Sequence, residues 1–157
     1  MSEYVKYDCS DITDDQTLIE ALQQMGWNTS QIEVHQNPVT LYGYHNDARP
    51  EKANIVIRRQ NVGSSSNDIG FLKLDDGTYQ PIVSEYDTST SGPRQRSEHF
   101  VTDVKSKYAR ITGEKCVAQI TNMTIPRMQQ QGIAGTPRNA KVSTVRVGNQ
   151  VQIKLTY

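Results

Sequence analysis

Two residues four positions apart in the second half of the chain, His99 and Asp103, are of the types that bind metal ions. If this segment is a helix, residues at i and i+4 share one face, so the imidazole and the carboxylate can act together. A metal site needs at least a third ligand, and His45 with Asp47 are candidates from a loop. A solvated helix face explains the same residues without any third ligand. We therefore predict no metal site, with His99 and Asp103 as the residues to test.

The sequence offers little for covalent or phosphate chemistry. Cys9 and Cys116 lie far apart and form no CxxC motif, so we expect two free, buried or half-buried thiols rather than a disulfide scaffold or a zinc site. Cys116 and His99 are the residue types of a thiol nucleophile and its base, but no local motif supplies oxyanion donors or an orienting acid. The chain has neither GxxxxGK[ST] nor GxGxxG. We expect no catalytic residue and no cofactor.

Basic residues gather around an expected helix and are the candidates for nucleic-acid binding. They are Arg94, Arg96, Lys105, Lys107, Arg110 and Lys115, with Tyr108 among them. Three acidic residues are interleaved with this group, and the pI of 6.8 is near neutral. A charged, exposed helix face predicts the same composition, whereas phosphate binding normally needs a clear basic surplus. We favour the exposed face and keep nucleic-acid binding as the alternative.

The composition is that of a small polar globular protein. With 157 residues, 35% of them hydrophobic, and a mean hydropathy of −0.66, we expect a single domain, residues 1–157, with a modest core. The net charge is zero, yet residues 1–83 carry 6 Lys and Arg against 12 Asp and Glu, and residues 84–157 carry 11 against 5. This polarity favours partner contacts, although we expect folding to interleave the halves. No stretch matches a membrane span of about 20 residues or a secretory signal, which predicts a cytoplasmic location and no membrane partner.

Local patterns in the first half predict a strand, a helix and an antiparallel meander. Residues 4–9 alternate as a strand does, and a capping box from Thr13 to Gln16 opens a helix that Gly26 ends. Trp27 is expected to pack on that helix. The meander is predicted as three short strands, Ile32–His35, Leu41–Tyr44 and Ala53–Arg59, separated by Asn37-Pro38 and by residues 46–50. Residues 61–67 are expected to form a polar, flexible loop tip.

The second half begins with a hairpin, Asp68 to Val83, that turns at Asp75-Asp76-Gly77. Pro81 cannot donate a ladder hydrogen bond, so its strand either lies at a sheet edge or places the proline at a non-bonded position. An edge there makes Pro81 a candidate for partner binding. A polar loop at residues 88–92 precedes a helix that Ser97 opens.

Beyond that helix, Pro126 predicts a kink or restart before Gly132. A hairpin from residues 142–147 and 150–157 closes the chain. The element order predicts an α+β fold: two layers, with a mostly antiparallel sheet and two main helices on one face, ferredoxin-like or related.

Several local strings, taken together, resemble one protein family. They are the early helix Leu18 to Trp27, Leu41-Tyr42-Gly43-Tyr44, Asp68-Ile69-Gly70-Phe71, Asp76-Gly77-Thr78-Tyr79, Ile82-Val83 and Tyr108-Ala109. On these strings most of the chain resembles the domain-of-unknown-function family twelve-fifty-seven, which includes the hypothetical chloroplast reading frame thirty-five of plastids and cyanobacteria. The closing segment is less similar, since Tyr157 stands where the family usually has tryptophan. The resemblance implies a small intracellular protein of bacteria, plastids or phages, located in the cytoplasm or the plastid stroma. It implies no settled activity, and it makes an AAA-type ATPase a partner to test.

From these observations we expect a non-enzymatic interaction or assembly subunit that binds a protein partner or copies of itself. The candidate interaction residues are Pro81, Arg94, Arg96, Lys105, Lys107 and Arg110. The alternative is a nucleic-acid-binding accessory protein that uses the basic helix around Arg94 to Lys115. A metal-dependent or cysteine-dependent enzyme is the third hypothesis.

Overall fold

The computed structural model describes residues 3–63, 65–85, 100–130, 141–147 and 150–156, with side chains as far as residue 122. The chain divides into two compact units, Met1–Tyr108 and Ala109–Tyr157. The first unit contains β1 (Tyr4–Lys6), α1 (Asp15–Gln24), the short 3₁₀ helix η1 (Thr29–Gln31), β2 (Ile32–Tyr42), β3 (Ala48–Ile57), α2 (Arg59–Val62), β4 (Ile69–Lys73), β5 (Tyr79–Ser84) and the first turns of α4 (Phe100–Gln130). The second unit contains the rest of α4 with β6 (Lys141–Val147) and β7 (Gln150–Thr156).

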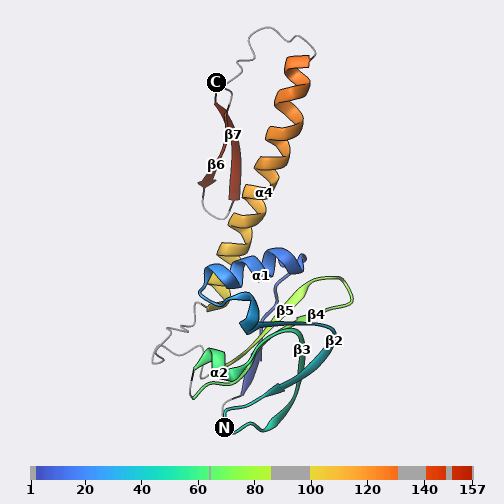
Figure 1. Ribbon diagram of the computed structural model, residues 1–157, viewed down its shortest axis with the longest axis vertical. Coiled ribbons are helices and arrows are strands. Elements are labelled where there is room, and N and C mark those ends of the chain that lie inside the picture. Colours follow the sequence, from blue (N-terminus) through green and yellow to red (C-terminus); the bar gives the residue numbers. More distant parts are fainter. Residues whose placement is uncertain (1–2, 64, 86–99, 131–140, 148–149, 157) are drawn as a thin grey trace. The chain divides into compact units, whose positions relative to one another are not determined.

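The first unit is built on a five-stranded sheet in the order β1-β5-β4-β3-β2, and every neighbouring pair is antiparallel (Figure 1). Strands β2 to β5 form a meander of sequential neighbours, and β1 joins it beside β5. The predicted α+β class is therefore confirmed. The meander is a related arrangement rather than the βαββαβ order of a ferredoxin-like fold.

The hairpin of β4 and β5 forms where the sequence predicts it. Gly77 adopts a φ of +85°, which favours glycine, and Asp76 Oδ1 accepts hydrogen bonds from Thr78 N at 2.9 Å and Thr78 Oγ1 at 2.6 Å. Because these turn contacts are all local, a short stretch of sequence is enough to specify the hairpin.

Strand β1 is shorter than the predicted strand at residues 4–9. Its register with β5 runs from Tyr4 opposite Ser84 to Lys6 opposite Ile82, so the next partner is Pro81. Proline has no N–H, and the one bond that continues the ladder is from Tyr7 N to Pro81 O at 3.0 Å. The strand ends there because its partner cannot donate.

Strand β2 is one long strand with irregular pairing, where the sequence predicted two pieces. The pairing of β2 with β3 changes register between Val34 and Val39 and again between Thr40 and Tyr42. The strand therefore continues through Asn37-Pro38, which was predicted to separate two strands. The separate-strand prediction was wrong because a bulge accommodates an extra residue and a proline without ending the pairing.

The bulged part of the β2–β3 hairpin packs on one face of the sheet. Val56, Gly70 and Ile82 are successive register partners and so share this face. Leu41 and Ala53 pack against it, and a Cβ placed on Gly70 would lie 2.6 Å from Ala53 Cβ and 2.9 Å from Leu41 Cδ1. Gly70 is therefore required by the close approach of the bent hairpin.

Helix α1 and the first turns of α4 lie together on one side of the sheet (Figure 1). Helix α1 buries Leu18, Ala21 and Leu22 and ends at Gly26, whose φ is +111° as the predicted left-handed stop requires. Its N-cap is Asp14, which accepts from Thr17 N at 2.8 Å, and not the predicted Thr13. A carboxylate at this position is also stabilised by the positive end of the helix dipole.

Aromatic side chains join α1 to α4. Trp27 is buried as predicted, meets the ring of Phe100 edge-on at 6.0 Å, and donates from Nε1 to Asn61 O at 3.0 Å. Tyr108 Oη accepts from the backbone N–H of Thr13 at 3.1 Å and of Asp14 at 2.9 Å, just before α1 begins. In the segment predicted as a polar loop tip, Asn61 belongs to α2 and both Ser66 and Asn67 are buried, so these three residues are not part of an exposed tip.

Helix α4 is continuous as far as Gln130, so the restart predicted at Pro126 does not occur. A proline removes one N–H, and the remaining hydrogen bonds of the adjacent turns can maintain the helix around it. The predicted closing hairpin is confirmed, with Val147 opposite Gln150. The predicted loop at residues 88–92 and the helix start at Ser97 lie outside the described residues. Among the described residues, no helix has the length and hydropathy needed to cross a membrane.

Candidate interaction surface

The open edges of the five-stranded sheet are β1 and β2, not β5. Strand β5 lies between β1 and β4, so the prediction that Pro81 marks an edge was wrong. The other alternative holds, because Pro81 O accepts from Tyr7 N and a residue in an antiparallel strand directs its nitrogen and its oxygen to the same neighbour. The ring nitrogen of Pro81 therefore faces the point where β1 ends, and no ladder hydrogen bond is lost inside the sheet.

The backbone of β2 has one side directed toward β3 and the other directed away from the sheet. Pro81 directs its backbone groups to β1, so its partner Phe71 directs its own groups to β3, and Ile55, the partner of Phe71, directs its groups to β4. Val34 lies opposite Ile55, so its backbone groups face outward, and those of Glu33 face β3. Strand β2 is the last strand in the sheet order, and Val34 thus presents its N–H and C=O at an open edge.

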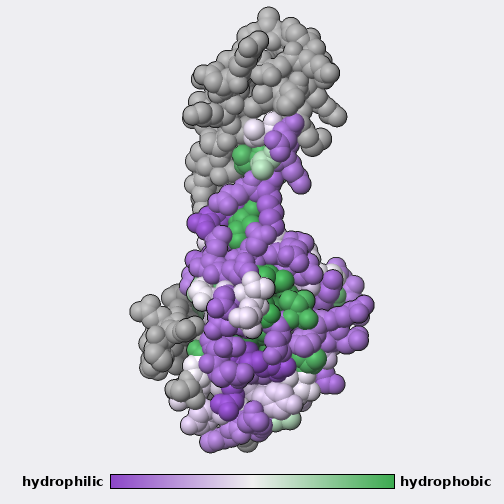
Figure 2. Space-filling model, in the orientation of Figure 1, coloured by the Kyte–Doolittle hydropathy of each residue, from purple (hydrophilic) through white to green (hydrophobic). Residues whose placement is uncertain are grey.

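Val34 is also the most exposed large hydrophobic residue of the described side chains, at 54%, ahead of Tyr44 at 43% and Leu74 at 36%. Figure 2 shows that apolar groups on the first unit occupy small patches within a mostly hydrophilic surface. An exposed β-branched residue on an outward-facing edge backbone is the feature that natural sheets usually protect. This combination makes the β2 edge, Ile32–Gln36, the candidate interaction surface.

Charged side chains flank Val34 on the strand. Glu33 Oε2 is 3.0 Å from His35 Nε2 and 2.9 Å from Arg58 Nε. Partial burial alone raises the pKa of Glu33, but the hydrogen bonds from Arg58 and His35 together outweigh it and hold this pKa below its ordinary value. Burial alone lowers the pKa of Arg58, but the carboxylates of Glu33 and Asp68 outweigh it and raise this pKa above its ordinary value. The edge is therefore zwitterionic around an apolar residue.

Asp68 anchors this charged group from inside the protein. Its side chain is 1% exposed and accepts from Arg58 Nη1 at 2.8 Å, Tyr42 N at 2.9 Å and Arg59 N at 2.7 Å. Arg58 Nη1 also donates to Thr40 O at 3.1 Å. These bonds tie β2 past its bulge to the ends of β3 and β4, so they hold the edge strand in place.

The charged candidates predicted from the sequence lie only partly within the described residues. Arg94, Arg96 and His99 lie outside the described residues. Lys105 lies 3.8 Å from Asp11, and Arg110 lies 3.8 Å from Glu114 on the same helix. At about 100° per residue, Lys105 and Arg110 are separated by about 140° around α4, so they occupy different faces.

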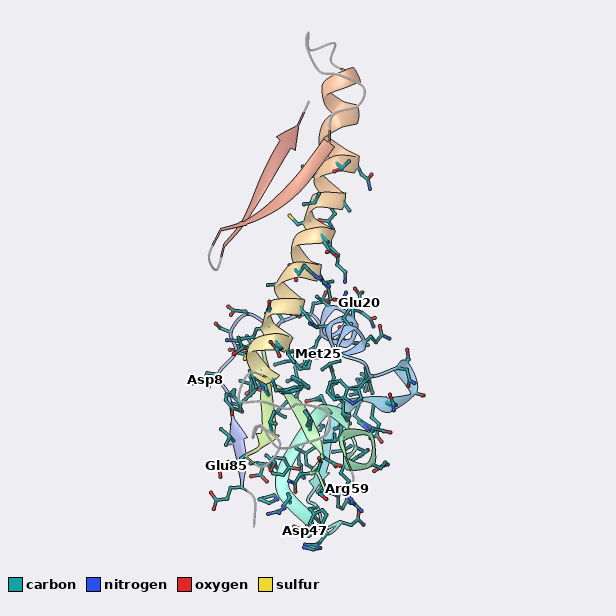
Figure 3. All side chains as sticks on the ribbon, turned by 90° about the vertical axis from the view of Figure 1, so that its left-hand side faces the viewer. Asp8, Glu20, Met25, Asp47, Arg59 and Glu85 are labelled. Carbon is teal, nitrogen blue, oxygen red and sulfur yellow. The ribbon has the colours of Figure 1, made fainter. Side chains whose placement is uncertain are left out.

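The metal hypothesis gains no third ligand from the structure. Among the described residues, no group of three or more His, Cys, Asp or Glu side chains is placed to bind a metal ion. Asp47 lies at the turn of the β2–β3 hairpin, at the far end of the first unit from α1 with its Glu20 and Met25 (Figure 3). Asp103 lies in the first turn of α4, whose Phe100 packs on Trp27 just after α1, so these two carboxylates are not brought together.

The cysteines are free thiols, as predicted, although Cys116 is exposed rather than half-buried. Burial raises the pKa of the Cys9 thiol, and the neighbouring Lys105 offsets only part of this. A raised pKa keeps the thiol protonated and unreactive at neutral pH. A hollow of about 370 Å³ beside Trp27 is lined by Gln23, Gly26, Trp27, Asn28 and Thr29, none of them charged.

Charge is divided between the two units instead of cancelling within them. Residues 1–108 carry 10 Lys and Arg against 16 Asp and Glu, a net charge of −6. Residues 109–157 carry 7 against 1, a net charge of +6. Residues 84–108 of the second half join the first unit but carry 4 Lys and Arg against 4 Asp and Glu, so they leave the net charge of that unit unchanged. The basic surplus lies in the second unit rather than around Arg94 to Lys107.

Comparison with known proteins identifies the family. A family model described as "Protein of unknown function (DUF1257)" matches residues 21–138. The chain belongs to this family. No curated protein and no solved structure matches. The match begins within α1 and covers the bulged β2–β3 hairpin, Asp68 and Gly70, so the family segment includes the candidate interaction surface.

Sequence reasoning missed Val34, Glu33, Arg58 and Asp68 as members of one surface. The sequence pattern predicts a strand at residues 32–35, but it does not indicate which strand of the sheet lies at an edge without a neighbour. Asp68 follows a run of small polar residues and precedes an apolar strand, which is a position where a side chain often bonds to nearby backbone. That signal was present and pointed to a structural role.

Proposed function

We propose that this chain is a non-enzymatic interaction or assembly subunit that binds a protein strand at the edge of β2. The observation that carries the proposal is Val34, which is 54% exposed on a strand that ends the sheet. An added strand would bond to the outward N–H and C=O of Val34 and cover its side chain. Main-chain bonds would supply affinity, and the flanking charges would supply selectivity.

The polar contacts near the edge also favour binding over catalysis. Arg58 and Asp68 are bonded to each other and to the backbone of β2, so their charges hold the strand in its shape. Pre-organised side chains of this kind reduce the entropy that a binding surface loses on association. An AAA-type ATPase stays a partner to test from the family resemblance.

Native mass spectrometry of the protein purified from its own source tests this function. The wild-type chain should carry a bound protein, either a copy or another chain, that Val34→Lys loses. Leu74→Lys is the matched control, because Leu74 is an exposed apolar residue in the β4–β5 turn. The function is refuted if the wild-type chain is alone under mild ionisation at every protein concentration, or if Val34→Lys retains the same bound protein.

The charge of the second unit supports one other function, nucleic-acid binding. With 7 Lys and Arg against 1 acidic residue, residues 109–157 have the basic surplus that phosphate binding needs. The test is the anisotropy of labelled DNA and RNA titrated at several salt concentrations. Binding through phosphates should weaken as salt rises, and Arg110→Gln with Lys115→Gln should lower the salt slope. No affinity at low salt eliminates this candidate.

A further inference from the structure

We propose that the strand bound at the β2 edge is β2 of a second copy of this chain, paired antiparallel about a two-fold axis at Val34. The inference rests on the proposed function and names its partner. Isologous pairing of this kind uses one patch twice, so the patch must be complementary to itself. The β2 edge meets this requirement in its backbone, its charges and its apolar residue.

The backbone limits where the two-fold axis can lie. The central residue must direct its N–H and C=O outward, which Val34 and Ile32 do and Glu33 does not. The N–H of Ile32 is already bonded to Thr29 O at the end of η1. Val34 is therefore the residue able to exchange both backbone hydrogen bonds with its own copy.

The charges select the same centre. With Val34 opposite Val34 of the second copy, Glu33 lies opposite His35 of that copy, and His35 opposite its Glu33. Acidic and imidazole groups then alternate across the pair, and like charges do not face each other. The contacts of Glu33 all involve Oε2, so Oε1 is available to accept a bond from the second copy.

The edge also limits the length of this pairing. The helix η1 ends at Gln31, and the register of β2 shifts after Val34 on the approach to Pro38. Gln36 O already accepts a bond from Asn54 Nδ2 at 3.1 Å, so the contact is confined to about five residues, Ile32 to Gln36, with its backbone hydrogen bonds centred on Val34. Such a short interface falls among weak, reversible contacts that bury less than about 1,200 Å². The dimer should therefore depend on protein concentration.

Sedimentation equilibrium over a wide concentration range tests the dimer with two pairs of variants. Val34→Lys should weaken association at least tenfold, since it sets two cations opposite each other, and Leu74→Lys should leave it unchanged. His35→Glu should weaken association because it sets carboxylates against Glu33 of the second copy. His35→Lys places an ammonium group opposite the carboxylate of Glu33 of the second copy and should retain the dimer. Far-UV circular dichroism and Trp27 emission show that each variant is folded.

Two results would overturn this inference. One is a wild-type chain that stays monomeric at every concentration, and the other is a dimer that Val34→Lys and His35→Glu leave intact. Neither result alone overturns the proposed function, because native mass spectrometry can still find a different protein bound in a Val34-dependent manner. If that bound protein is absent as well, the proposed function fails together with the inference.

Discussion

Substitution of Asp68 by asparagine should destabilise the first unit by about 3 kcal/mol. The buried carboxylate of Asp68 accepts bonds from three donors, on Arg58, Tyr42 and Arg59. Asparagine has the same shape but one acceptor oxygen. If the amide oxygen takes the place that serves Arg58 and Tyr42, its NH₂ group faces the N–H of Arg59, and a buried donor loses its partner at a cost of about 1–3 kcal/mol.

The loss of charge adds to this cost. Breaking a buried ion pair by removing one partner costs about 3–5 kcal/mol in general. The cost here lies below that range because the side chain of Arg58 is 20% exposed and keeps its bonds to Glu33 and Thr40. The two effects together lead to the expected value of about 3 kcal/mol, which is a large part of the stability of a small domain.

Urea unfolding followed by Trp27 fluorescence measures the change, because Trp27 is the single tryptophan and is buried in the same unit as Asp68. The midpoint should fall while the slope of free energy against urea stays the same. The control is Asp75→Asn, which removes an exposed carboxylate from the β4–β5 turn and should leave the midpoint unchanged. A loss of less than about 1 kcal/mol for Asp68→Asn would refute the anchoring role.

Three further outcomes are expected. Gly70→Ala should destabilise the protein by about 1–3 kcal/mol in the same urea assay, since its Cβ would meet Ala53 Cβ at 2.6 Å, and an unchanged midpoint would contradict the packing. Tyr108→Phe should cost about 1–3 kcal/mol because two N–H groups before α1 lose their acceptor, and retained stability would argue against this contact. The lowered pKa of Glu33 means that its stabilising effect is full above pH 4.5 and is lost as pH falls through the depressed value. Acid titration should thus show less loss of stability in Glu33→Gln than in the wild-type chain, and identical acid profiles would contradict the linkage.

Local signals in the sequence identified the elements that local contacts specify. Gly26 and Gly77 have positive φ values at the predicted helix end and hairpin turn, and both positions were readable because glycine adopts this conformation at low cost. Trp27 was assigned to the core from its place after an amphipathic helix. The α+β class followed from the order of such elements.

The errors concern contacts between residues distant in sequence. A proline is excluded from an inner strand only where its missing N–H would face a paired residue. Strand β1, more than 70 residues earlier in the sequence, stops pairing at the residue opposite Pro81, so this condition does not apply. The bulge after Val34 depends on the bent hairpin packing over Gly70. Asp68 was placed at the start of a hairpin, but its three donors come from other elements. No local pattern contains these pairings.

The division of charge between residues 1–108 and 109–157 affects how the protein behaves during purification. A chain with zero net charge is ordinarily expected to pass through ion-exchange columns at neutral pH. A resin bead, however, interacts with the nearest surface within about one Debye length, roughly 10 Å at 0.1 M salt, and not with the charge of the whole molecule. At low salt the −6 unit should be retained by an anion exchanger and the +6 unit by a cation exchanger. Isoelectric focusing reports only their sum, so it conceals both charges.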